Sequence, residues 1–144
     1  MSHIDLADGL RYCMNDVFVT KDLLRKQFME EKEMNRKITL VGSMKFKDAM
    51  MEIYNRFTLR GDCVFLPYMG VIPEDANEDI IEKLHELHKD KMRMSDFVVV
   101  VDQDGYIGKD TQAEINWCVK QGMQIIYASD LAMLEKTKPY KIQK

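Results

Sequence analysis

The apolar run Phe97-Val98-Val99-Val100-Val101 constrains the fold more than any other part of this 144-residue chain. Valine fills most of it, and the branched valine side chain favours strands over helices. A strand that is apolar at every position has no side suited to water, so it belongs in a sheet covered on both faces. The run therefore predicts the central strand of a parallel α/β domain.

Three further short apolar runs, at residues 37–41, 62–66 and 124–127, also look like strands. Between the strands, apolar residues recur at spacings of three and four, as on one face of a helix. This alternation predicts a doubly wound parallel sheet of four to five strands with helices on both faces. The residues that carry the helical periodicity are Phe46, Ala49, Met50, Ile53 and Phe57, then Ile81, Leu84, His88 and Met92, then Ile115, Cys118 and Val119.

The segment before residue 37 has a different pattern. Residues 4–14 and 21–34 look helical, and Thr20 is a suitable N-cap for the second helix. We therefore expect an N-terminal helical extension over residues 1–36 and an α/β domain over residues 37–144. Ser129 is the expected cap of a short C-terminal helix over residues 129–135.

Charge and composition indicate which classes of partner this chain is suited to bind. The net charge of −3 gives no basic field for nucleic acid or an anionic membrane. The longest apolar run has five residues, too few to span a bilayer, and the first residues lack the pattern of a signal peptide. Three scattered cysteines without CxxC spacing are typical of reduced thiols. The sequence thus predicts a cytoplasmic protein that binds neither nucleic acid nor membrane.

The first strand ends at Gly42, followed by Ser43 and, two residues later, Lys45. A glycine here lets a ligand approach the backbone, and a hydroxyl with a cation suits phosphate or another anion. Neither the Walker pattern nor GxGxxG is present. A plain strand-to-helix turn capped by Ser43 explains the same residues, and the residues alone favour it.

The strand at residues 97–101 ends in a loop that contains Gly105 and Gly108, followed by Asp110, Thr111 and Glu114. Thr111 and Glu114 have the spacing of a capping box, in which the glutamate reaches back to the backbone at the start of a helix. In α/β proteins, however, ligands bind at the carboxyl ends of the strands. Glu114 is therefore either a helix cap or a catalytic group, and spacing alone favours the cap.

His85 and His88 lie among carboxylates on a helical segment and raise the question of a metal site. Their HxxH spacing is not the HExxH pair of zinc enzymes. We interpret them as part of a solvated or partly packed helix face and predict no metal.

Residues 87–101, followed by the loop and helix start at residues 104–115, resemble the nucleoside 2-deoxyribosyltransferase-like superfamily. The likeness is greatest to small members with a Gly-Tyr-Ile-Gly…Thr…Glu-Ile loop, and it covers residues 37–128. It implies a doubly wound α/β fold, no cofactor, and cleavage of the N-glycosidic bond of a nucleoside or nucleotide.

The resemblance also implies roles for individual residues. Glu114 would attack C1′ of the sugar and form a glycosyl ester, and Asp90 or Asp110 would help to protonate the leaving base. The two strand-end loops would frame the sugar and hold its 5′ end. The substrate-binding residues expected on this basis are Gly42, Ser43, Lys45, Asp96, Gly105, Tyr106 and Gly108.

Two positions depart from the family pattern. Many members carry a first-strand tyrosine that orients the nucleophile, whereas this chain has Thr39, and Tyr106 is a candidate substitute. The transferases tend to carry Gly-Pro after the first strand, and Gly42-Ser43 is closer to the nucleotide N-hydrolase branch. We therefore expect hydrolysis, with base transfer or non-catalytic nucleotide binding as alternatives. Because members often build the site across a subunit interface, we also expect a homo-oligomer.

Overall fold

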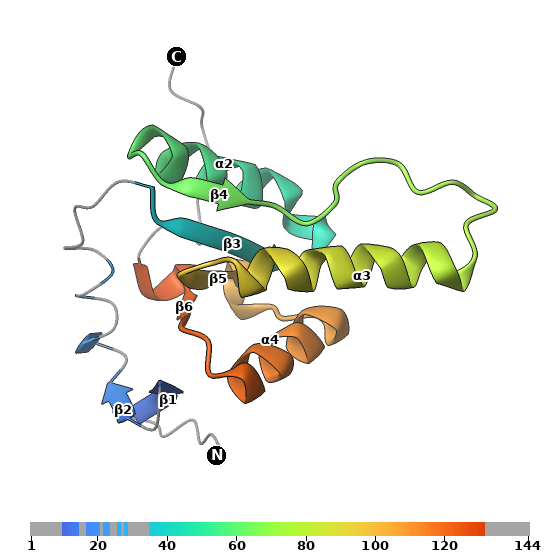
Figure 1. Ribbon diagram of the computed structural model, residues 1–144. Coiled ribbons are helices and arrows are strands. Elements are labelled where there is room, and N and C mark those ends of the chain that lie inside the picture. Colours follow the sequence, from blue (N-terminus) through green and yellow to red (C-terminus); the bar gives the residue numbers. More distant parts are fainter. Residues whose placement is uncertain are drawn as a thin grey trace.

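The structure is a computed structural model that describes residues 10–14, 17–20, 22, 23, 26, 28 and 35–131 (Figure 1). Its centre is a four-stranded, all-parallel sheet with the order β4-β3-β5-β6. The strands are β3 (Lys37–Gly42), β4 (Cys63–Phe65), β5 (Phe97–Val101) and β6 (Ile125–Tyr127). The predicted doubly wound α/β fold is confirmed.

Three helices connect the strands: α2 (Lys47–Leu59), α3 (Glu78–Arg93) and α4 (Lys109–Gln121). The chain runs from β3 outward to β4, then crosses back past β3 to β5 and β6. With right-handed crossovers, this reversal places α2 on one face of the sheet and α3 and α4 on the other (Figure 1). Short 3₁₀ turns are η1 (Met44–Phe46), η2 (Gln103–Gly105) and η3 (Ala128–Leu131).

The core lies on both faces of β5, all of whose residues are buried, as the continuous apolar run predicts. From α2, Met50, Ile53 and Phe57 are fully buried. Met92 of α3 and Cys118 of α4 meet on the opposite face, where the two sulfur atoms lie 3.4 Å apart. Among the described residues, no helix has the length and apolar character needed to cross a membrane.

The N-terminal prediction is wrong for residues 10–14. They form β1 (Leu10–Met14), which pairs antiparallel with β2 (Val17–Thr20), and Thr20 ends this strand where a helix cap was expected. The sequence reason is an Asn15-Asp16 pair between two runs that include aromatic and β-branched residues, a composition that favours a hairpin. Residues 1–9 lie outside the described part. The described positions within 21–34 are helical, as expected.

Phe28 belongs to the core of the α/β domain, although it precedes the predicted boundary at residue 37. Its fully buried ring packs edge-on against Phe57 and Phe97, with ring centroids 5.5 and 4.8 Å away. Buried Arg36 donates from Nη1 to the Phe28 carbonyl at 2.7 Å and pairs through two 3.0 Å bonds with the Asp62 carboxylate. Phe28 and Arg36 are thus fixed beside α2 and the first residue of β5.

The sequence predicted that Ser129 would cap a C-terminal helix. In the structure, Ser129 lies within η3. Its backbone N–H and its hydroxyl donate to the Asp102 carboxylate at 3.0 and 2.6 Å. The end of β5 is thereby tied to the turn that follows β6. Residues 132–144, which include the rest of the predicted helix, lie outside the described part.

Candidate active site

The strand order reverses between β3 and β5, and ligands in doubly wound sheets bind outside the carboxyl ends of strands at such a point. A cavity of about 620 Å³ lies there. Its walls come from the end of β3, the loops after β4 and β5, the inner side of α3 and the first turns of α4. This volume lies within the range of small-molecule sites.

Glu114 lines this cavity and does not cap the helix. α4 begins at Lys109, with Gly108 as its N-cap, so Thr111 is already inside the helix and buried. The N–H of Gln112 is satisfied by the Gly108 carbonyl at 2.9 Å. The capping box predicted by spacing is therefore wrong, because the glycine lets the helix start earlier than the threonine.

Glu114 faces His88 across the cleft. Its Oε2 lies 3.4 Å from Nε2 of His88, so the contact joins α4 to α3. The histidine side chain is 6% exposed and the glutamate side chain 26% exposed. Nδ1 of His88 is buried and has no hydrogen-bond partner. The carboxyl group of Glu114 is thus accessible to a ligand on one side, and on the other side it contacts the buried imidazole of His88.

Burial raises the pKa of Glu114 to about 7, and the neighbouring charge of Asp110 adds to this shift. The ammonium of Lys89 acts in the opposite direction but is the smaller influence. Near neutral pH the carboxyl group is therefore balanced between its protonated and ionised forms. Such a shifted carboxyl in a cleft is typical of a group that handles protons or attacks an electrophile.

Burial also lowers the pKa of His88 to about 4, and the charges of Lys91 and His85 contribute further. The imidazole is consequently neutral at physiological pH. Because a neutral imidazole carries one N–H, the ring can donate a hydrogen bond to Glu114 without bringing a positive charge. The contact between them is not an ion pair of two charged groups near pH 7.

Five predicted site residues line the cleft beside Glu114: Gly42, Ser43, Tyr106, Gly108 and Asp110. Ser43 also caps η1, because its Oγ accepts from the Lys45 N–H at 3.2 Å, which confirms the plain turn that its sequence suggested. A side chain at Gly42 would approach the Val101 carbonyl to 3.1 Å, so packing of β3 on β5 already requires this glycine.

Lys45 lies at the rim rather than in the wall. Its Nζ is 4.0 Å from the centroid of the Tyr106 ring, and Phe46 packs edge-on against the same ring at 5.6 Å. These contacts connect η1 to the loop after β5 and place a cation near the mouth of the cleft.

Three predicted residues are not brought to the cleft. Asp90 is exposed on the outer side of α3, where it pairs with Arg93 at 2.5 Å. It follows His88 by two residues, and a two-residue step turns a side chain to the opposite side of a helix. Gly105 provides the positive φ of 75° needed by the turn but does not line the cavity.

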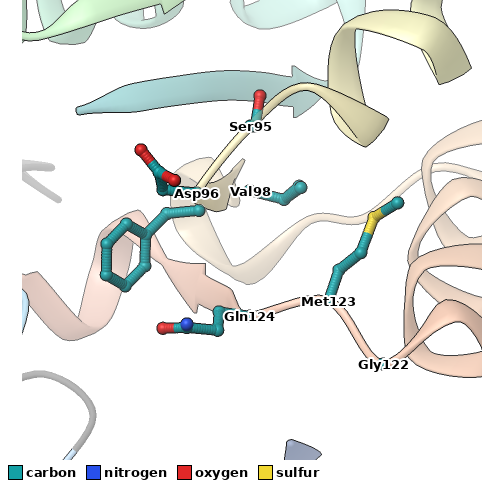
Figure 2. Close-up of a pocket in the computed structure, with 7 residues that line it drawn as sticks. Ser95, Asp96, Val98, Gly122, Met123 and Gln124 are labelled. Carbon is teal, nitrogen blue, oxygen red and sulfur yellow. The ribbon is translucent and has the colours of Figure 1, made fainter. Parts of the chain in front are cut away.

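Asp96, the third, precedes β5 and therefore lies at the amino edge of the sheet, away from the carboxyl edge where the cleft opens. Its Oδ2 accepts from the Lys37 N–H at 2.9 Å. There it borders a separate cavity of about 260 Å³, which Figure 2 shows with Met123 and Gln124. Asp96 thus joins two neighbouring strands and has no contact with the candidate site.

Sequence reasoning placed His88 on the buried face of its helix but gave it no role at the site. The available signal was an imidazole at a position of the helical pattern whose other members, Ile81, Leu84 and Met92, are apolar. The neighbouring His85 also lines the cavity. Thr39 is fully buried and hydrogen-bonded to the Lys91 carbonyl and the Ser95 hydroxyl, so it does not orient Glu114. Within the described part of the chain, no cluster of three potential ligands is arranged for a metal ion.

Comparisons with protein-family models, with curated proteins and with solved structures found no match for this chain.

Proposed function

We propose that this chain hydrolyses the N-glycosidic bond of a nucleoside or nucleoside 5′-monophosphate, with Glu114 as the nucleophile, as its likeness to the nucleoside 2-deoxyribosyltransferase-like superfamily implies. The observation that carries the proposal is the place of Glu114, which is free of helix capping and lines the cavity at the strand switch point. Its pKa of about 7 makes the ionised form accessible at neutral pH.

In the proposed reaction, an Oε of ionised Glu114 bonds to C1′ while the C1′–N bond breaks and its electron pair leaves with the base. The departing base takes a proton from a water molecule that the Asp110 carboxylate binds. The hydroxide so formed attacks C1′, and the ester bond to Glu114 breaks. Both carboxylates are regenerated, and the products are the free base and the free sugar.

Asp110 is the better placed of the two carboxyl groups expected to help protonate the base. It lines the cavity one turn before Glu114 on α4, where its carboxylate can bind the water that supplies the proton. Asp90 lies on the outer side of α3 and is engaged with Arg93.

Lys45 supports a substrate that carries a 5′-phosphate. It is exposed at the rim, next to Tyr106, and it adds a cation close to the Ser43 hydroxyl, which itself lines the cavity. A phosphate bound at this rim would leave the sugar and the base inside the cleft. We therefore favour a nucleotide over a free nucleoside.

The direct test is release of free base, measured by chromatography after incubation with each of the common nucleosides and 5′-monophosphates. Glu114→Ala should abolish the release, whereas Glu82→Gln, on the outer side of α3, should retain it. Base release that survives Glu114→Ala would rule out the assigned nucleophile.

Two outcomes would favour the alternatives. A new nucleoside that forms only when a second free base is added would indicate a base-exchanging transferase, since the glycosyl ester then passes to the base instead of water. Nucleotide binding without base release from any substrate would indicate a non-catalytic module. The replacement of the expected first-strand tyrosine by Thr39 is the observation that keeps the second alternative open.

We further propose that two copies of the chain pair through α3. Ile80, Leu87 and Met94 are exposed at seven-residue spacing and so form one stripe along the helix. α3 and the loop before it extend beyond the sheet (Figure 1). Val71 and Ile72 of that loop are also exposed apolar residues. An unpartnered apolar surface of this kind marks an interaction site.

The charges beside the stripe fit a second copy in antiparallel orientation. Lys83 and Asp90 each follow a stripe residue by three positions and so lie on the same side of it. In an antiparallel pair centred on Leu87, Lys83 approaches Asp90 of the partner subunit, and the twofold axis repeats this contact.

A further inference from the structure

We propose that His88 is a positioning residue for Glu114, whose carboxylate it holds toward the cleft by donating a hydrogen bond from Nε2–H to Oε2. This inference rests on the proposed role of Glu114 as the nucleophile.

The geometry places the two groups in contact from opposite helices. Nε2 of His88, on α3, is 3.4 Å from Oε2 of Glu114, on α4. This separation is somewhat longer than an ordinary N–H···O hydrogen bond. In many ligand-free enzymes, catalytic hydrogen bonds are long in this way and shorten in the complex with substrate. The imidazole is enclosed, so it can approach the carboxylate but has little freedom to turn away.

The unpaired Nδ1 of His88 indicates which of the two ring nitrogens carries the proton. Nδ1 is buried without a partner, and a buried N–H without an acceptor is costly. The neutral ring avoids that cost when its single proton is on Nε2, the atom that faces Glu114. Burial, which lowers the pKa of His88 to about 4, keeps the ring neutral under physiological conditions.

Of the two other side chains considered for this task, Thr39 is hydrogen-bonded elsewhere and Tyr106 packs at the rim. The hydroxyl of Thr39 is bonded to the Lys91 carbonyl and to Ser95. The ring of Tyr106 packs against Lys45 and Phe46 at the rim. His88 is therefore the side chain placed to orient the carboxyl group of Glu114.

Several titratable groups surround the pair. Lys91 and His85, on α3, act on His88, whereas Asp110, on α4, and Lys89, on α3, act on Glu114. Cys118, on α4, lies near Glu114. Tyr68 and Lys109 also border the cleft. A variant that tests His88 must leave all of these groups in place, so that any change in the titration of Glu114 comes from the lost donor.

The matched variants are His88→Gln and His88→Met. The side chains of glutamine and methionine have similar length and volume, but only glutamine places an N–H donor near the position of Nε2. The pKa of Glu114 is followed by carbon NMR of labelled glutamate carboxyl groups. We expect the pKa of Glu114 to be higher in the methionine variant than in the glutamine variant, because a hydrogen bond to the ionised form favours ionisation. If base release is observed, kcat should fall about 10- to 100-fold in the methionine variant, with KM less affected and partial recovery in the glutamine variant.

The NMR titration separates the two proposals. Equal pKa values for Glu114 in both variants would overturn the positioning role, whether or not the protein releases base. Absence of base release by the unaltered protein, with a pKa difference between the variants, would instead overturn the proposed reaction. Nitrogen NMR of the His88 ring in the unaltered protein requires no mutation. It should show the proton on Nε2, and a proton on Nδ1 would contradict the inference.

Discussion

His88 and Glu114 face each other across the cleft with Nε2 and Oε2 3.4 Å apart, and burial moves their pKa values in opposite directions, to about 4 and about 7. Near neutral pH, therefore, any proton that the pair shares belongs to the carboxyl group and not to the imidazole. Because His88 is neutral, it does not lower the pKa of Glu114 as a cation would. The pKa of Glu114 therefore stays close to neutral pH.

Base release should rise with pH through about 7. The nucleophile must be ionised, and the raised pKa of Glu114 keeps it protonated below that value. The pH dependence of kcat/KM checks this, because it reports groups of the free enzyme. A rate that is already maximal at pH 5 would contradict the assignment of Glu114 as the ionising group.

Glu114→Gln should stabilise the protein at pH 8 and have a smaller effect at pH 5. The folded-state pKa of about 7 exceeds the ordinary value of 4.5, so ionisation of Glu114 costs folding free energy that grows between these pH values and is complete above 7. We expect a gain of about 1–2 kcal/mol at pH 8, less than the full shift implies, because the side chain is 26% exposed. Urea unfolding at both pH values measures it, with Glu82→Gln as the exposed control. An equal effect at both pH values would show that the pKa is not raised.

Arg36→Met should destabilise the fold by about 3–5 kcal/mol, because it leaves the buried carboxylate of Asp62 without its partner. The control is Arg93→Met. This second arginine also pairs with a carboxylate, that of Asp90, but the two side chains are 48% and 59% exposed, and we expect a loss below about 1 kcal/mol. Denaturant unfolding compares the two variants. Losses of equal size would mean that the contact between Arg36 and Asp62 does not anchor the chain before β3.

Leu87→Glu should convert the proposed dimer to a monomer without unfolding it, because the leucine is 55% exposed on the outer stripe of α3. Leu59→Glu is the matched control, since Leu59 is 88% exposed at the end of α2, away from that stripe. Light scattering during size-exclusion chromatography gives the mass of each variant. A dimer that persists in Leu87→Glu, or an unaltered protein that is monomeric at high concentration, would contradict pairing through α3.

The sequence predicted the α/β core well because the signals there are local. The bounds of β5 follow from an unbroken apolar run, and the end of α4 follows from Gly122, which adopts the left-handed conformation expected of a terminal glycine. The hairpin at residues 10–20 was missed because helical periodicity was given more weight than turn composition. The burial of Phe28 depends on long-range packing, which no local pattern reports.

The candidate site was predicted only in part, for a physical reason. Glu114 and the glycines could be assigned to one edge of the sheet because parallel strands all end there. The places of Asp90 and His88 depend on how α3 is rotated about its axis, and two residues separate an outward carboxylate from an inward imidazole. The sequence pattern indicated the inward face correctly, but it could not indicate that α4 would place an acid against it.

The most direct measurement of the central claim is mass spectrometry of the protein after rapid acid quenching during incubation with a nucleoside 5′-monophosphate that it cleaves. The account predicts a glycosyl ester on the peptide that contains Glu114, absent from the Glu114→Gln variant. Base release without any such adduct on Glu114, or an adduct on a different residue, would contradict it.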